Sequence, residues 1–316
     1  MNPTVQAQWL KQLPPWLYKL GAQSYIDYQY PRHLFIETTA ACNLTCSYCP
    51  RERVNSHMDF QVLRRIVDEA TSYGPRSFSL HLFGEPLLYK QWEQAVAYIK
   101  SRDHRHTVLL TTNGTLIERG DTLGRLVGSE IDQVYWTWRP EAKFTQETKG
   151  KLRRWGKFRV RFIREVTPPE AYEEWSDWPN VEGRKLHNYG GNIQTERFGT
   201  ERSVRNASSF TSENLSTQLN VSSANGNSRW ACYHLWLAPA VAWNGNILLC
   251  CADSHQKEVI GQFPQMSVHE AWTGGRIKSV RDGHMKGEYL GICKDCDVWK
   301  QYPDLFFSWQ KKGVPQ

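Results

Sequence analysis

Apolar and polar positions follow a regular strand–helix order along the first two thirds of the chain. Short runs rich in β-branched and aromatic residues predict strands, and between them apolar residues recur every three or four positions, which predicts helices. The strands are predicted at residues 33–39, 77–84, 106–114, 131–139 and 157–166, with a weaker one at 182–190, and the helices at 59–73, 89–102, 115–128 and 141–155. Strands and helices alternating at this spacing predict parallel βαβ units, which form either an open sheet or a barrel.

The pattern changes in the last third of the chain. Residues 194–228 are dominated by Ser, Asn and Thr and have little apolar periodicity, so they are predicted to be a flexible insertion at a domain boundary. A hairpin is predicted at 240–251 around the Asn244-Gly245 turn, followed by a helix at 267–283. Residues 1–32 are predicted to be a lead-in to the first strand.

Composition excludes several classes of protein. Of the 316 residues, 40% are hydrophobic and 22% are charged, which is typical of a globular chain. No run of apolar residues is long enough for a transmembrane helix, and no signal peptide is recognised, so we expect a cytoplasmic protein without a membrane partner. The net charge is +7, and residues 149–164 hold eight basic residues and no acid. Such a run binds nucleic acid or is a solvated helix leading into a strand; the mixed charges elsewhere favour the second interpretation.

Eight cysteines in a chain without an export signal indicate metal chemistry rather than disulfides. The first group, Cys42-x3-Cys46-x2-Cys49, follows the first predicted strand. Three thiolates can hold three corners of a four-iron cluster and leave one iron open to a substrate. Zinc is the alternative, although a structural zinc site normally takes four ligands.

At this point the sequence resembles the radical S-adenosylmethionine (SAM) enzymes, whose signature is Cys-x3-Cys-x-aromatic-Cys. Tyr48 is the aromatic residue here. Gly84-Glu85-Pro86 ends the second predicted strand, where the family has a Gly-Gly-Glu-like motif, and Phe83 replaces its first glycine. Thr112-Asn113-Gly114 ends the third strand, where the family often has Thr-Asn-Gly.

The resemblance implies a partial (β/α)6-type TIM barrel with a [4Fe-4S] cluster on Cys42, Cys46 and Cys49 as the catalytic centre. The residues that would bind the cofactor SAM are Tyr48, Gly84, Glu85, Pro86, Asn113 and Gly114. Within these, Glu85 would accept a hydrogen bond from the SAM ammonium. The family cleaves SAM to a 5′-deoxyadenosyl radical after one electron arrives, which implies an electron donor such as flavodoxin or ferredoxin.

A second cysteine group lies near the C-terminus, with the pattern Cys232-x12-Gly245-x4-Cys250 and then Cys293-x2-Cys296. Spacing alone leaves a structural zinc ribbon open. The pattern resembles the auxiliary-cluster region of the SPASM/twitch subgroup, which implies one further [4Fe-4S] cluster on these four cysteines, as in the shorter twitch version. Cys251 is spare; it replaces Cys250 as a ligand or is a buried thiol, and we favour the second.

The expected domains are a lead-in (1–32), a radical SAM partial barrel (33–193), an insertion (194–228) and a twitch/SPASM-like domain (229–316). The expected reaction is a two-electron dehydrogenation of a small polar metabolite that begins with hydrogen abstraction. Radical SAM modification of a peptide is one alternative. A non-catalytic module that binds zinc or nucleic acid is an alternative of another class.

Strand alternation also predicts which side chains face the interior of the barrel. Helix-facing positions are predicted at Phe78, Leu80 and Leu82, at Val134, Trp136 and Trp138, and at Phe158, Val160 and Phe162. The interior positions are then His81, Tyr135, Thr137, Arg139, Arg159 and Arg161. Several arginines in the interior suit an anionic substrate or the carboxylate of SAM.

Overall fold

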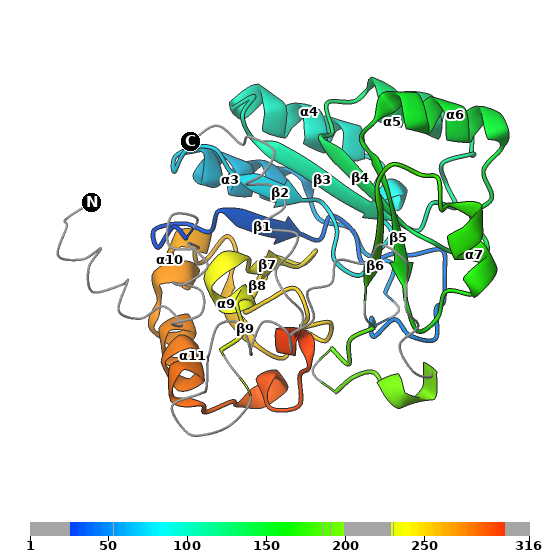
Figure 1. Ribbon diagram of the computed structural model, residues 1–316. Helices are drawn as coiled ribbons and strands as arrows, with labels where there is room; N and C mark the ends of the chain where they lie inside the picture. The colour runs from blue at the N-terminus through cyan, green and yellow to red at the C-terminus, as the bar shows by residue number, and fades with distance from the viewer. Residues whose placement is uncertain are drawn as a thin grey trace.

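The structure, a computed structural model, describes residues 26–52, 54–184, 186–189, 191–198, 229 and 231–300. The described strands form one sheet in the order β6-β5-β4-β3-β2-β1-β7-β8-β9 (Figure 1). They are β1 (His33–Ile36), β2 (Ser77–Ser79), β3 (Thr107–Thr112), β4 (Gln133–Thr137), β5 (Phe158–Ile163), β6 (Val181–Arg184), β7 (Ala240–Val241), β8 (Asn246–Leu248) and β9 (Val259–Gln262). Strands β1 to β6 pair in parallel, and β7 continues in parallel on the other side of β1. The predicted βαβ order is therefore confirmed.

Helices α3 (Phe60–Thr71), α4 (Trp92–Arg102), α5 (Thr122–Gly128), α6 (Gln146–Trp155) and α7 (Pro169–Glu174) follow the outside of the curved sheet (Figure 1). Helices α9 (His234–Leu237), α10 (Val268–Thr273) and α11 (Gly275–Lys286) lie beside the strands β7 to β9. The result is the α/β architecture that the sequence predicts, a curved sheet of parallel strands with helices outside it, extended past β7 by the antiparallel strands β8 and β9.

Helix α3 shows why the apolar periodicity was informative. Its buried residues are Leu63, Ile66, Val67 and Ala70, which share one face at helical spacing. Asp59 caps the helix, because its carboxylate accepts a hydrogen bond from the backbone N–H of Gln61 at 2.7 Å.

Several element boundaries differ from the prediction. The second strand ends at Ser79, so the alternation fails beyond it, and Leu82 packs with Ala240 and Leu248 instead of facing the helices. The predicted helix 267–283 is two helices, because Gly274 is extended (φ −73°, ψ 168°) between α10 and α11. The prediction of a helix from residue 115 was also wrong, since α5 begins at Thr122. Helix α7 was not predicted.

Side chains alternate across β4 and β5 as predicted. On the helix side, Trp136 packs on Phe158 with ring centroids 6.1 Å apart and both rings buried. On the interior side, the guanidinium of Arg161 lies 4.2 Å above the ring of Tyr135. The two strands therefore present an apolar face to the helices and a polar face to the interior.

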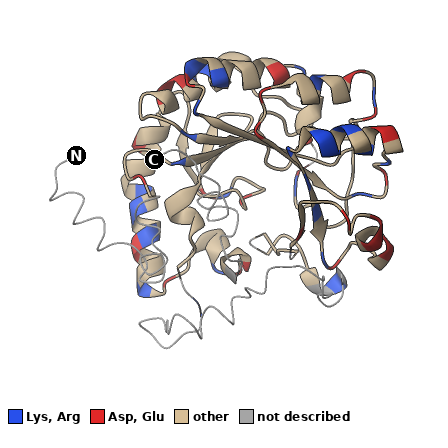
Figure 2. Ribbon diagram, turned by 45° about the horizontal axis from the view of Figure 1, so that its top comes forward, with Lys and Arg blue, Asp and Glu red and all other residues tan. Residues whose placement is uncertain are grey.

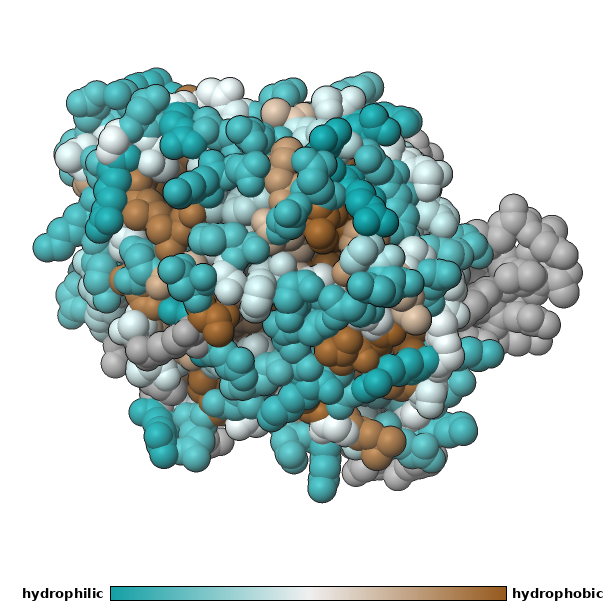
Figure 3. All heavy atoms as spheres, turned by 180° about the vertical axis from the view of Figure 1, so that it is seen from behind, coloured by the Kyte–Doolittle hydropathy of each residue, from teal (hydrophilic) through white to brown (hydrophobic). Residues whose placement is uncertain are grey.

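The basic run 149–164 forms helix α6 and strand β5. On α6, Lys149, Lys151 and Arg153 each pair with an acidic side chain, and Figure 2 shows basic and acidic residues interspersed on the outer helices. This is the solvated helix leading into a strand that we favoured. The face opposite to Figure 1 is mostly hydrophilic with separate apolar patches (Figure 3). Among the described residues, no helix has the length and apolar character needed to cross a bilayer.

The segment before β1 links the parallel strands and their helices to helix α10 in the C-terminal part of the chain. The carboxylate of Asp27 pairs with Arg76 at 2.7 Å, and the Arg76 side chain is only 2% exposed. The backbone carbonyl of Asp27 accepts the indole N–H of Trp272 in α10 at 3.0 Å. Glu69 on α3 accepts the backbone N–H of His269 at 2.8 Å, which adds a second link to the start of α10.

We expect Asp27→Asn to lower the free energy of unfolding by about 3 kcal/mol, because it leaves the buried charge of Arg76 without its counter-ion. Denaturant titration measures the loss. The matched control is Asp177→Asn, which breaks an exposed pair with Arg153 at 2.8 Å and is expected to change stability little. Equal losses in the two variants would show that the Asp27 pair is an ordinary surface contact.

Candidate functional site

The first cysteine group lies on the loop between β1 and α3. Cys42, Cys46 and Cys49 are free and partly exposed, and the backbone N–H of Cys49 donates to the carbonyl of Cys46 at 3.1 Å. The guanidinium of Arg51 donates to the carbonyls of Cys42 and Leu44 at 3.4 and 3.2 Å, which holds the loop in shape. The sequence analysis missed Arg51, because a basic residue just after a cysteine motif is not distinctive.

Electrostatics at this loop suit a group that binds thiolates. Burial raises the pKa of Cys42 and Cys49, and the neighbouring thiols oppose the ionisation of Cys49 further. Metal loading at this loop therefore releases protons. Burial also raises the pKa of Tyr48, and the guanidinium of Arg139 lies 5.1 Å from the centre of its ring. Both side chains thus lie beside the cysteine loop.

Gly84 allows the next loop to approach the cysteine loop closely. A Cβ atom at this position would lie 1.9 Å from the carbonyl oxygen of Thr39 and 2.9 Å from that of Ala41. The following backbone N–H, that of Glu85, donates to the carbonyl of Ala41 at 2.8 Å. Only glycine permits this contact, which explains why the motif contains one.

The carboxylate of Glu85 joins three segments. It is 2% exposed, accepts the hydroxyl of Thr112 and the backbone N–H of Asn113, both at 2.7 Å, and caps the short helix η2 (Pro86–Leu88). The amide of Asn113 in turn lies 3.8 Å from the sulfur of Cys42. Gly114 has a φ of +82°, and a Cβ there would lie 2.4 Å from the indole nitrogen of Trp136. The structure therefore brings the predicted cofactor-binding residues together around Cys42.

The second cysteine group gathers from separate segments. Cys232 precedes α9, Cys250 follows β8, Cys293 ends the 3-10 helix η4 (Gly291–Cys293), and Cys296 precedes the 3-10 helix η5 (Val298–Lys300). Burial raises the pKa of Cys250, and the thiols of Cys251, Cys293, Cys232 and Cys296 raise it further. These thiols therefore lie near one another in buried surroundings. Their ionisation there would be favoured only with a cation bound.

The thiols do not converge on a single point. Within the described ranges, no group of three or more His, Cys, Asp or Glu side chains is close enough to hold one metal ion. A multi-iron cluster is larger than one ion and takes its thiolates from positions farther apart. The donor set, three thiols on one loop and four in the other region, fits such clusters.

Several residues that hold the second group were not foreseen. The guanidinium of Arg229 donates to the carbonyls of Cys293 and Lys294. The imidazole of His284 accepts the backbone N–H of Cys232 at 3.3 Å. Arg229 and His284 contact cysteines that lie 64 and 52 positions away in the sequence, so spacing gave no sign of these contacts. Cys251, which follows Cys250 directly, has its sulfur 3.7 Å from Nδ1 of His234.

Tyr189 lies between the two cysteine groups. Burial raises the pKa of its phenol to about 12, and the ionised thiols of Cys49 and Cys251 add to that shift. Its φ of +47° is unusual for a residue other than glycine. The segment is held by a reciprocal pair of hydrogen bonds between Asn188 and Asp297, at 2.9 and 3.0 Å. The ring thus lies within electrostatic range of both groups.

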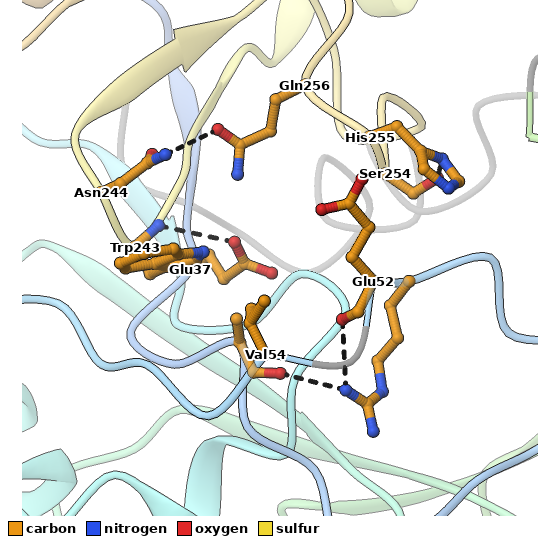
Figure 4. A pocket seen from close by; sticks show the side chains of 10 residues that line it. Glu37, Glu52, Val54, Trp243, Asn244, Ser254, His255 and Gln256 are labelled. Atoms are coloured by element: carbon orange, nitrogen blue, oxygen red, sulfur yellow. Dashed lines mark hydrogen bonds between the residues drawn. The ribbon is translucent and has the colours of Figure 1, made fainter.

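A cavity of 220 Å³ lies at the junction of β1 with the β7–β8 hairpin (Figure 4). The carboxylate of Glu37 lines it, 4% exposed, and accepts weak hydrogen bonds from the backbone N–H groups of Phe83 and Trp243 at 3.3 and 3.4 Å. Burial raises the pKa of Glu37 from 4.5 to about 7. This carboxylate links the first half of the sheet to the hairpin.

Two family models match the chain. The model described as "Radical SAM superfamily" matches residues 36–136, and the model described as "Iron-sulfur cluster-binding domain" matches residues 232–297. The first match contains the cysteine loop and both later motifs. The second match contains the four C-terminal cysteines and Cys251.

Curated relatives match to different extents. The S-adenosyl-L-methionine-dependent 2-deoxy-scyllo-inosamine dehydrogenase of Niallia circulans is 23% identical over 273 residues, which is 83% of this chain and 91% of that protein. A probable GTP 3′,8-cyclase of Methanococcus maripaludis is 33% identical over 92 residues. That match covers 28% of this chain and 30% of the cyclase, so it is confined to part of each protein.

Solved structures share the fold. The crystal structure of BtrN in complex with AdoMet and 2-DOIA has a TM-score of 0.59 and 19% identity, covering 84% of this chain and 92% of BtrN. Streptococcus suis SuiB bound to its precursor peptide SuiA has a TM-score of 0.61 and 16% identity, covering 90% of this chain and 73% of SuiB. At these identities the likeness shows the fold, a partial barrel with a C-terminal domain.

We expect Gly84→Ala to lower the melting temperature and the iron content after reconstitution, because the new methyl group would clash with the backbone of Thr39. Thermal unfolding and iron analysis measure both effects. The control is Gly128→Ala, since a Cβ at Gly128 meets nothing within 4 Å and the change is expected to be neutral or slightly stabilising. An unchanged melting temperature and iron content in Gly84→Ala would mean that the close contact between the Gly84 loop and the cysteine loop is not needed for stability or iron binding.

The raised pKa of Glu37 predicts a pH dependence of stability. The folded protein holds this proton more tightly than the unfolded chain, so the contribution is complete below about pH 4.5 and is lost as the pH rises through about 7. The loss is about 3 kcal/mol, taking 1.36 kcal/mol for each pKa unit. We expect Glu37→Gln to flatten this part of the profile in denaturant titrations. Glu147→Gln, an exposed control, is expected to leave it unchanged, and a slope that survives Glu37→Gln would assign the effect elsewhere.

Proposed function

We propose that this chain, a radical SAM enzyme with a C-terminal iron–sulfur cluster-binding domain, dehydrogenates a small hydroxylated metabolite. The observation that carries the proposal is the position of Tyr189: its ring lies 5.8 Å from that of Phe83 beside Gly84, and its neighbour Asn188 bonds Asp297 next to Cys296. A substrate near Tyr189 would lie between the two groups. The dehydrogenase relative, which matches along 83% of this chain, supports the same reaction class.

The enzyme uses SAM and two [4Fe-4S] clusters, and we assign their ligands from the two groups. Cys42, Cys46 and Cys49 would hold the cluster that binds SAM. The auxiliary cluster would take Cys232, Cys250, Cys293 and Cys296. Cys250 is preferred to Cys251 because its ionisation is opposed by all three other thiols of the set, whereas Cys251 responds mainly to burial and to Arg184.

The bound groups would supply the redox chemistry, and this chain would position the substrate between them. When bound, SAM and the first cluster would supply a radical able to abstract a hydrogen atom from a carbinol carbon, and the auxiliary cluster would supply an acceptor for the second electron as the hydroxyl proton is lost. The protein's own part is to keep the substrate between the two cysteine groups. Strands β1 and β7 would fix that arrangement, because the first cysteine loop follows β1 and the hairpin that begins with β7 leads to Cys250.

Glu85 and Asn113 would orient SAM beside Cys42. Burial raises the pKa of Glu85 to about 7, and an ammonium beside it would favour the ionised form. Its Oε1 accepts two protein donors and its Oε2 accepts the backbone N–H of Asn113. A carboxylate oxygen can accept more than one donor, so Oε2 has capacity left for the SAM ammonium. Tyr48, Gly84, Pro86 and Gly114 would complete the surroundings.

The partners follow from the same chemistry. An electron donor such as flavodoxin or ferredoxin would approach the partly exposed cysteine loop. We place the protein in the cytoplasm, because eight free thiols suit a reducing compartment. SuiB, which shares the fold, is bound to a precursor peptide in its crystal structure. A peptide is therefore the alternative substrate class that an experiment must distinguish from a small metabolite.

We expect the anaerobically reconstituted protein to hold about eight irons per chain, and the variant with Cys42, Cys46 and Cys49 all changed to Ala to hold about four. The double variant Cys293→Ala/Cys296→Ala is expected to cleave SAM to 5′-deoxyadenosine with a strong reductant, yet not to complete substrate oxidation. Iron analysis and product chromatography measure these outcomes. Cys251→Ala is the matched control and is expected to keep all the iron.

Circular dichroism must first show that the double variant is folded, since loss of a cluster can unfold a small metal domain. A folded double variant with full turnover would remove the electron-acceptor role from the second site. The substrate itself is sought in anaerobic extracts as a SAM-dependent loss of two hydrogens. If that loss is found in a peptide rather than in a small metabolite, the dehydrogenation holds but the substrate class proposed here is wrong.

A further inference from the structure

Three charged side chains form an array on the interior face of β5 and β6. The carboxylate of Glu182 accepts a hydrogen bond from Nε of Arg161 and another from Nε of Arg184, the second at 3.2 Å. Arg161 also stacks on the ring of Tyr135, which fixes the plane of its guanidinium. The array holds two positive charges and one negative charge, so its net charge is +1.

Each arginine keeps donors that no protein group uses. Within the part of the chain that the structure describes, the hydrogen bonds of Arg161 and Arg184 are made by Nε alone, and neither pair of Nη atoms has a protein acceptor. The Nη atoms are not among the enclosed buried polar atoms that lack a partner. The side chains of Glu182 and Arg184 keep 35% and 25% exposure, so solvent reaches the array.

His81 adds another donor next to this array. Its Nδ1 accepts the backbone N–H of Thr111 at 3.2 Å, which leaves the proton of the neutral ring on Nε2. Burial lowers the pKa of His81, and the charges of Arg161 and Arg184 lower it further, so the ring is neutral at pH 7. The array therefore faces the interior with donors from three side chains and one carboxylate that is already paired.

We propose that Arg161, Arg184 and His81 bind an oxyanionic group, a carboxylate or a phosphate, on the hydroxylated substrate. Two guanidinium forks with unused Nη atoms match the paired oxygens of such a group. Glu182 holds the two forks side by side, because its Oε1 accepts a hydrogen bond from Nε of each arginine. That the bound ligand is the substrate rests on the proposed function. The existence of the anion site does not.

We assign the anion to the substrate rather than to the carboxylate of SAM, because the contacts of Arg161 and Arg184 in the described residues are with Glu182 and Tyr135 and not with the first cysteine loop. Arg184 influences the ionisation of Cys251 and His234, which belong to the C-terminal half. The arginines that contact the first cysteine loop are Arg51, through the carbonyls of Cys42 and Leu44, and Arg139, stacked on Tyr48. A cationic substrate would meet the net positive charge of the array and would be disfavoured.

The test is calorimetry on the reconstituted, SAM-loaded enzyme with inorganic phosphate and acetate as minimal probes. Glucose 6-phosphate, glucuronate, glucose and glucosamine then separate the two oxyanions from neutral and cationic sugars. We expect at least one oxyanion to bind, and Arg184→Gln to weaken it about ten- to a hundredfold. Arg184→Lys keeps the charge but loses the guanidinium fork, so its oxyanion affinity is expected to lie between those of the unchanged protein and Arg184→Gln. Arg153→Gln, an exposed control, is expected to have no effect.

The direction of the affinity change in Glu182→Gln distinguishes an anion site from an array that only stabilises the fold. Removal of its negative charge is expected to tighten oxyanion binding, whereas Arg184→Gln weakens it. The proposal is overturned if neither phosphate nor acetate binds, if glucose or glucosamine binds more tightly than both sugar anions, if the two variants shift affinity in the same direction, or if Arg184→Gln weakens SAM equally. SAM cleavage with a strong reductant is measured separately, so its absence would count against the proposed function and leave the anion site to be judged by calorimetry.

Discussion

The backbone pairing of β1 with two neighbours is the constraint on which the rest of the site depends. On one side β1 pairs in parallel with β2, and on the other side the backbone N–H of Glu37 donates to the carbonyl of Val241 in β7 at 2.8 Å. The first cysteine loop leaves the end of β1, and the hairpin that begins with β7 leads to Cys250. Adjacent strands are about 4.8 Å apart, so a single hydrogen-bond ladder sets how far apart the two cysteine groups can be.

Much of this arrangement could be predicted from local patterns, and the reason differs from place to place. Helix α3 was predicted because the apolar spacing that specifies it acts within a few residues. The chemistry of the first cysteine group was predicted because its three cysteines lie on one loop and match a family signature. The two motifs at Gly84 and Asn113 came from the same resemblance, and the structure places them beside Cys42.

The rest depends on contacts between distant residues, which periodicity does not reveal. Leu82 was assigned to the wrong face because β2 ends early and the chain turns toward the hairpin. Arg51 and Arg229 hold the cysteine segments through backbone carbonyls, a role that any arginine could take. The continuous sheet from β6 to β9 was not foreseen either, since the pairing of β1 with β7 joins residues about two hundred positions apart. Residues 1–25 and 199–228, which include most of the predicted lead-in and insertion, lie outside the described residues.

The left-handed backbone at Tyr189 has an evolutionary consequence. A bulky residue at a φ of +47° costs on the order of 1 kcal/mol, and glycine or asparagine would relieve that cost. The reciprocal bonds between Asn188 and Asp297 compensate for it locally. A population of this chain selected only for resistance to heat would therefore drift away from tyrosine at this position. Persistence of the ring would mark selection for what lies between the two cysteine groups, rather than for the fold.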